Sequence, residues 1–185
     1  MRIRALLCAL VLPLAAHAAT SLTFNPPAGV TARGKHVVLL SGDEEYRSEE
    51  ALPMLAKILS QRHGFRCTVL FALDADGVIN PENQRSLAGS AALDSADAIV
   101  MSLRFRNWPE ADMARFVAAF NRGVPVIALR TSTHAFNIPP GSPYAQYSWN
   151  SRAPWPGGFG KHVLGETWIS HWGRHKFEAT RGVAE

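Results

Sequence analysis

The sequence has very few cysteines, since only Cys8 and Cys67 occur in 185 residues. Cys8 lies in an N-terminal stretch that is typical of a cleaved export signal, so the mature chain would keep a single cysteine. One cysteine cannot form an intrachain disulfide, which excludes a disulfide-stapled fold even in an oxidising compartment. Because Cys67 opens a predicted strand, we expect it to pack as a small buried apolar residue rather than a reactive thiol.

The chain also lacks a long apolar run and a strong excess of one charge. A basic start, apolar Ala5–Leu14 and the small-residue site Ala16–Ala18 follow the order of an export signal. The apolar stretch is too short to span a bilayer, so we expect residues 1–18 to be removed and the product to be periplasmic or secreted without a membrane anchor. Loss of Arg2 and Arg4 lowers the formal net charge from +4 to +2, and no basic stripe indicates a nucleic-acid partner.

Hydrophobic residues make up 47% of the chain and charged residues 18%, which favours a packed core over disorder. We expect residues 19–35 to be a leader segment and residues 36–185 to form one domain. Expected strands are His36–Leu40, Cys67–Leu73, Asp97–Leu103 and Val124–Leu129; expected helices are Glu49–Arg62, Pro81–Ala92 and Pro109–Arg122. Apolar strands alternating with helices predict an α/β fold with a doubly wound parallel sheet and helices on both faces.

The C-terminal third breaks this alternation. After Phe136 the chain is irregular and rich in proline, glycine and aromatic residues, with short strands expected at Trp168–Trp172 and Lys176–Thr180. The chain reaches Glu185 with no closing helix, which we interpret as truncation of the domain.

Polar residues follow the predicted strands, at the edge where open parallel sheets bind their ligands. Guanidinium, carboxylate and ring groups together suit a small polyhydroxylated or anionic ligand, although solvated loop charges would give a similar pattern. The candidate substrate-binding residues are Asp43, Glu44, Tyr46, Arg47, Arg104, Arg106, Arg130, Thr131, Ser132, Thr133 and Trp168.

Three histidines are candidate acid–base groups, because histidine titrates near neutral pH: His134, His171 and His175. The spacing of His171 and His175 would place both on one face of a helix, as in some zinc sites, but Gly173 between them argues against a helix. A divalent metal bound by this pair, with His134 or Glu166 as third ligand, stays an open alternative. No motif requires any other cofactor.

Three blocks together resemble one family: LLSGDEEYRSEEALPMLAKIL, VPVIALRTSTHAFN and GGFGKHVLGETWISHWGRH. Their order and content are similar to the ThuA-like domain family, named for trehalose utilisation, over Gly34–Val183. The resemblance implies a class I glutamine amidotransferase-like fold with a flavodoxin-like sheet. It also implies sugar or disaccharide catabolism, including routes through 3-keto sugars alongside a partner oxidoreductase. Family members usually continue past the point where this chain stops.

In amidotransferases of this fold a nucleophilic cysteine occupies the turn after the strand equivalent to Val124–Leu129. The turn here is Arg130–His134 and contains no cysteine, which excludes glutamine hydrolysis through a thiolate. Ser132 is a poor substitute, because the β-branched neighbours Thr131 and Thr133 fit a strained nucleophile turn badly.

The resulting expectation is an exported domain that acts on a sugar-derived metabolite such as a 3-keto disaccharide or glycoside, by isomerisation, elimination or hydrolysis. His134 with His171 or His175 would move protons, while Arg130 would stabilise a developing oxyanion and Asp43 or Glu44 would orient hydroxyls. Two alternatives are a non-catalytic carbohydrate-binding module of a larger secreted protein and a metal-dependent hydrolase using the histidine pair. The sequence leaves the oligomeric state open.

Overall fold

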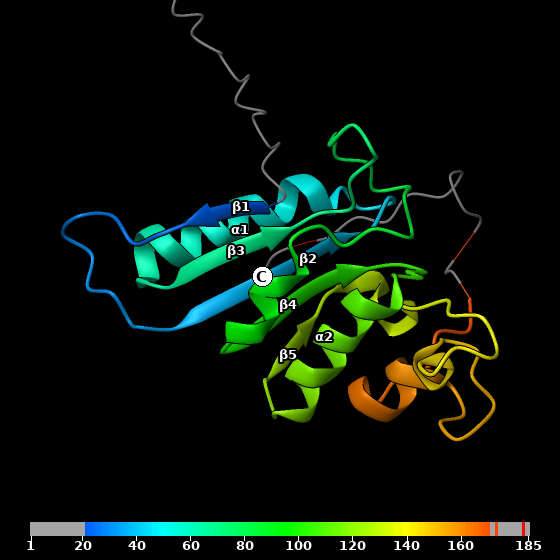
Figure 1. Cartoon of the computed structure of the whole chain (residues 1–185). Helices are drawn as coiled ribbons and strands as arrows, with labels where there is room; N and C mark the ends of the chain where they lie inside the picture. Colours follow the sequence, from blue (N-terminus) through cyan, green and yellow to red (C-terminus); the bar gives the residue numbers. More distant parts are fainter. Residues whose placement is uncertain (1–20, 171–172, 174–182, 184–185) are drawn as a thin grey trace, which may run out of the picture.

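The computed structural model describes residues 21–170, 173 and 183. Five strands form one sheet in the order β1-β3-β2-β4-β5 (Figure 1). Their bounds are Ser21–Phe24 (β1), His36–Gly42 (β2), Arg66–Leu70 (β3), Ala98–Leu103 (β4) and Val126–Ala128 (β5). Strands β2 to β5 are parallel, and β1 runs antiparallel to β3 at one edge. The parallel strand order reverses direction at β2, which confirms the predicted doubly wound α/β sheet.

Helices α1 (Ser48–His63) and α2 (Glu110–Asn121) cover opposite faces of the sheet. Successive side chains of a strand point to opposite faces, and the central strand β2 shows this directly. Val37 and Leu39 pack in the cluster with α1, whereas Val38 and Leu40 pack in the cluster with α2. A central strand buried on both faces explains why its sequence is a continuous apolar run.

The helix expected at Pro81–Ala92 does not form. Turns occupy most of that stretch, and a short 3-10 helix, η1 (Ser90–Ser95), follows them. The side-chain oxygens of Asn80 and Asn83 each accept a hydrogen bond from the backbone N–H two residues later, at 3.0 and 3.1 Å. Such local bonds offer the backbone an alternative to the helical ladder, which explains the failed prediction.

The segment at residues 19–35, expected to precede the fold, contributes strand β1 to the sheet. Its four residues, Ser21–Phe24, are partly or fully exposed, so the strand has no apolar run by which the sequence could reveal it. The leader interpretation therefore has to be corrected for these residues.

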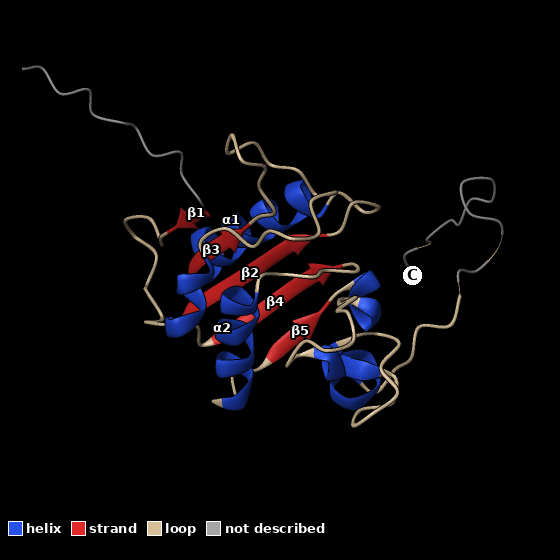
Figure 2. Ribbon diagram, turned by 45° about the vertical axis from the view of Figure 1, so that its right-hand side comes forward, coloured by secondary structure: helices blue, strands red, loops and turns tan. Residues whose placement is uncertain are grey.

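Between β5 and residue 170 the chain forms three short helical turns, η2 (Arg130–His134), η3 (Ala145–Tyr147) and η4 (Gly160–Leu164), which lie on the outer side of β5 (Figure 2). Phe136 and Phe159 from this irregular stretch pack against Phe116 of α2 in the core. No strand forms at residues 168–170, and the rest of the two short strands expected there lies outside the described residues. Within residues 21–170, no helix is long and apolar enough to cross a membrane.

Candidate functional site

A cavity of about 280 Å³ opens at the C-terminal edge of the sheet, and we call it the strand-end cavity. The turn after β2, the η2 turn and the Trp168 side chain surround it. Its lining residues are Glu45, Tyr46, Arg130, Thr131, Thr133, His134 and Trp168. Six of these seven belong to the set predicted from the sequence. The doubly wound topology explains the convergence, because it brings the ends of neighbouring parallel strands to one edge.

Arg130 occupies the strained corner of the turn that follows β5. Its φ of 50° is left-handed, which is uncommon for any residue other than glycine. The exposed guanidinium lies 4.0 Å from the centroid of the Tyr46 ring. No ion pair to this guanidinium is present among the described residues. The strained corner thus presents a cation, stacked on an aromatic ring, to the cavity.

Ser132 has a different role from the nucleophile considered for this turn. Its side chain is buried, and its hydroxyl donates to the Met101 carbonyl and accepts from the Leu103 N–H, both at 3.1 Å. Both bonds go to strand β4, so Ser132 anchors η2 to the sheet and does not line the cavity.

His134 is held by aromatic rings. Its ring centroid lies 4.9 Å from that of Phe105 and 4.6 Å from that of Trp168, and Trp149 packs against both of these neighbours. Nδ1 lies 3.3 Å from the Thr133 hydroxyl, and the whole residue is only 3% exposed. The imidazole is therefore fixed in orientation at the wall of the cavity.

Phe105 was not predicted as a site residue, yet it positions His134. Its backbone N–H donates to the His134 carbonyl at 3.0 Å, and its own φ is 52°. Among the described residues, the non-glycine residues with positive φ are Arg47, Phe105 and Arg130, and all three follow parallel strands at this edge. Each such conformation costs about 1–3 kcal/mol, and strain of this kind clusters at functional sites. Nothing in a bulky apolar residue indicates this conformation from sequence.

The acidic turn after β2 is largely used to hold the rim together. The Glu44 carboxylate pairs with Arg104 and, at 2.9 Å, with Arg106, and Glu45 lies 3.2 Å from Arg104. Arg106 is fully buried and also donates to the backbone oxygens of Arg104 at 2.6 Å and Pro81 at 2.8 Å. Burial lowers the pKa of the Arg106 guanidinium, while Glu44 and Asp43 oppose that shift.

The close approach of the Arg106 side chain explains a glycine in strand β2. A Cβ on Gly42 would lie only 2.9 Å from Cδ of Arg106. Glu44, Arg104 and Arg106, all expected to bind substrate, instead form an internal network outside the lining of the cavity.

Asp43 is also turned inward. Its carboxylate accepts hydrogen bonds from the Thr131 hydroxyl and, at 3.0 Å, from the Glu45 N–H, and it is fully buried. Asp43 therefore connects the end of β2 to η2 rather than facing a ligand. Arg47 pairs with Glu50 of α1 and does not line the cavity.

The predicted histidine pair, His171 and His175, lies outside the described residues. Within the part of the chain that the structure describes, no group of three or more His, Cys, Asp or Glu side chains could hold a metal ion. Glu166, considered as a third ligand, is exposed, and its carboxylate accepts from the Thr167 N–H at 2.9 Å. Cys67 is fully buried, and burial raises the pKa of its thiol to about 11, as expected for an unreactive side chain.

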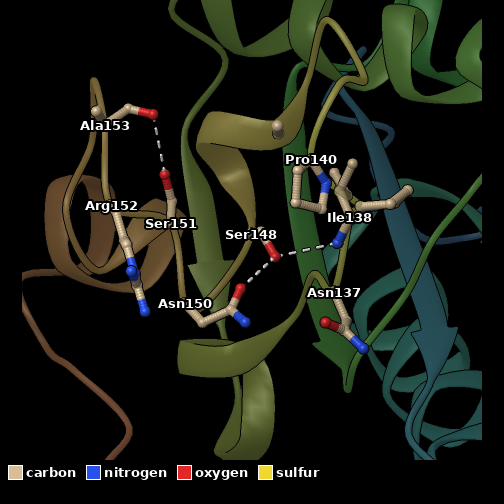
Figure 3. Close-up of a pocket in the computed structure, with 10 residues that line it drawn as sticks. Asn137, Ile138, Pro140, Ser148, Asn150, Ser151, Arg152 and Ala153 are labelled. Atoms are coloured by element: carbon tan, nitrogen blue, oxygen red, sulfur yellow. Dashed lines mark hydrogen bonds between the residues drawn. The ribbon is translucent and has the colours of Figure 1, made fainter.

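A second, larger cavity of about 600 Å³ lies in the loop that follows Phe136, and we call it the loop cavity. Figure 3 shows its lining residues, which come from residues 137–153. None of them was predicted from the sequence, because isolated amides, prolines and one arginine in a loop carry no recognisable spacing.

Comparisons of the chain with family models, curated proteins and solved structures found no match.

Proposed function

We propose that this domain binds a sugar-derived metabolite in the strand-end cavity and transfers a proton at a carbon next to a keto group. The observation that carries the proposal is the convergence of Arg130 and His134 on one cavity with the rings of Tyr46 and Trp168. The resemblance to ThuA-like domains supports a keto-sugar as the substrate. Isomerisation and elimination of a 3-keto disaccharide or glycoside both begin with such a proton transfer. Hydrolysis begins in the same way when the C–H proton and the glycosidic oxygen are first lost by elimination and water then adds to the double bond.

Arg130 and His134 divide the chemistry between them. The Arg130 guanidinium carries no carboxylate partner among the described residues, so it is available to polarise a keto oxygen and stabilise the charge that develops there. An imidazole held in one orientation can act as the general base that removes the proton from the neighbouring carbon. His171 or His175 is the proposed partner for returning the proton.

The size of the cavity limits what it encloses. Its volume of about 280 Å³ is slightly below the roughly 300 Å³ at which pockets for drug-sized ligands begin. One sugar ring therefore fits inside, against the faces of Tyr46 and Trp168, and a second ring of a disaccharide extends into solvent. The keto group requires prior oxidation of a hydroxyl, so an oxidoreductase acts earlier in the same route.

Binding without turnover is the second candidate function, in which the domain is a carbohydrate-binding module of a larger secreted protein. The observation that favours it is the burial of His134, which is 3% exposed between Phe105 and Trp168. An imidazole so enclosed has little surface through which to exchange a proton with a ligand, and it then serves only as part of the cavity wall.

The two functions are separated by a turnover screen. The protein is incubated with disaccharides and their 3-keto derivatives, and products are followed by mass spectrometry. The proposal predicts consumption of at least one keto-sugar, lost in His134→Asn and Arg130→Gln but retained in Arg47→Gln, which alters the same rim outside the cavity. Saturable binding with no product would favour the binding module, and neither binding nor product would refute both.

A further inference from the structure

The loop cavity has the composition of a second small-molecule site. At about 600 Å³ it lies well within the roughly 300–1,000 Å³ typical of ligand pockets. Apolar residues form much of its lining: Ile138, Pro139, Pro140, Ala145 and Ala153. Within the described part of the chain, the polar residues that line it include one charged residue, Arg152, and no acidic residue.

Three polar side chains in this cavity have donors to offer a ligand. Asn137, Asn150 and Arg152 are exposed, and the Asn137 amide, the Asn150 Nδ2 group and the Arg152 guanidinium make no hydrogen bond within the described residues. In the view of Figure 3 the Asn150 side chain lies between those of Arg152 and Asn137. A ligand rich in acceptor oxygens and carrying negative charge would satisfy them together.

The site is held in place by bonds within the loop. The buried Ser148 hydroxyl accepts from the Ile138 N–H at 3.1 Å and donates to Asn150 Oδ1 at 3.0 Å (Figure 3). This pair of bonds fixes the orientation of the Asn150 amide and leaves its NH₂ group free to bind. The Trp149 N–H, in turn, donates to the Phe136 carbonyl at 2.9 Å, which ties the loop to the core. Such preorganisation lowers the entropic cost of binding.

We propose that the loop cavity binds a sugar that carries a carboxylate, at a site distinct from the strand-end cavity. The planar guanidinium of Arg152 matches a carboxylate with two parallel hydrogen bonds. Asn137 and Asn150 bind hydroxyls, while the proline-rich wall contacts the apolar C–H face of the ring. This site does not depend on the proposed chemistry, because the two cavities share no lining residue.

The first test compares two ligands that differ by one carboxylate. Calorimetric titration of the whole protein with galacturonic acid and with galactose should show at least about tenfold tighter binding of the acid, as expected for a charge-assisted contact to arginine. Equal affinities, or no saturable binding of the acid, would overturn the proposal. Displacement of the acid by an equal concentration of inorganic phosphate would show an anion site without sugar recognition and would also overturn it.

Variants then locate the binding. Arg152→Gln should bring the two affinities within about twofold of each other. Because the Arg152 side chain is exposed, the variant should keep the melting temperature of the unaltered protein, which a melting curve checks. Asn150→Asp keeps the acceptor oxygen that Ser148 needs but replaces the NH₂ donors by a carboxylate oxygen. The new negative charge repels the carboxylate of the ligand, so binding of the acid should weaken by at least about tenfold.

Two control variants complete the test. Arg62→Gln removes an exposed arginine from α1, on the opposite face of the sheet, and should leave binding unchanged. Arg130→Gln should also leave it unchanged. Loss of galacturonic acid binding in Arg130→Gln, with retention in Arg152→Gln, would place the acid in the strand-end cavity and refute the second site.

Discussion

The Arg130 guanidinium lies 4.0 Å from the centroid of the Tyr46 ring. This contact joins two turns that follow different parallel strands, β2 and β5. A cation over an aromatic face gains about 0.5–1 kcal/mol at an exposed site, which offsets part of the strain in the Arg130 backbone. The rest of the backbone strain at Arg130 is not offset by this contact. A strained residue whose guanidinium faces a cavity is the pattern expected of a binding residue.

Arg130→Gly and Arg130→Ala form a matched pair that separates strain from charge. Both remove the guanidinium, but only glycine adopts a φ of 50° without steric cost. We expect the glycine variant to be more stable than the alanine variant by about 1 kcal/mol, and both to lose ligand binding equally. Urea denaturation gives the stability difference. An alanine variant as stable as the glycine variant would show that the turn is unstrained.

Ser132→Ala tests whether the turn carries a nucleophile. The loss of bonds to the Met101 carbonyl and the Leu103 N–H should lower the free energy of unfolding by about 1–3 kcal/mol. Activity on any substrate identified should persist at temperatures where the variant stays folded. A fully folded variant without activity would instead restore Ser132 as the attacking group.

Arg106 should be required for stability. Replacement by Met would leave the mostly buried Glu44 carboxylate with one fewer partner, and we expect a loss of about 3 kcal/mol. Arg47→Met is the matched control, because its ion pair with Glu50 is exposed and should contribute less than about 1 kcal/mol. Similar losses in the two variants, measured by denaturation, would contradict the structural role of Arg106.

His36 should make the fold sensitive to mild acid. Burial lowers the pKa of its imidazole, an effect that nearby Arg66 reinforces and Asp97 partly opposes. Below the ordinary pKa of about 6.5 the unfolded chain then binds more protons than the folded one, so stability falls as the pH drops from about 7 toward the folded pKa.

A pair of histidine variants checks this assignment. His36→Gln should reduce the loss of stability between pH 7.5 and pH 5.5, whereas His63→Gln, at an exposed position, should not. Urea midpoints at the two pH values measure the difference. An unchanged pH dependence in His36→Gln would show that other groups cause it.

The sequence predicted the sheet because buried strands such as Val37–Leu40 are continuous apolar runs, and it predicted the location of the cavity because the topology fixes which turns converge. It did not predict which polar residues face that cavity. Arg106 and Arg130 are the same residue type after neighbouring strands, yet one is fully buried and the other exposed. That difference depends on the tertiary partner Glu44, and the role of Phe105 depends on a backbone conformation that its residue type disfavours.

The most direct test of a sugar-binding strand-end cavity is the indole N–H signal of Trp168 in an NMR titration with a 3-keto glucoside. Trp168 lines that cavity, whereas Trp108 is buried in the core and serves as an internal control. The account predicts a saturable shift of the Trp168 signal, an unchanged Trp108 signal, and loss of the shift in Arg130→Gln. A keto-sugar that the protein consumes or binds while the Trp168 signal stays unchanged would contradict it.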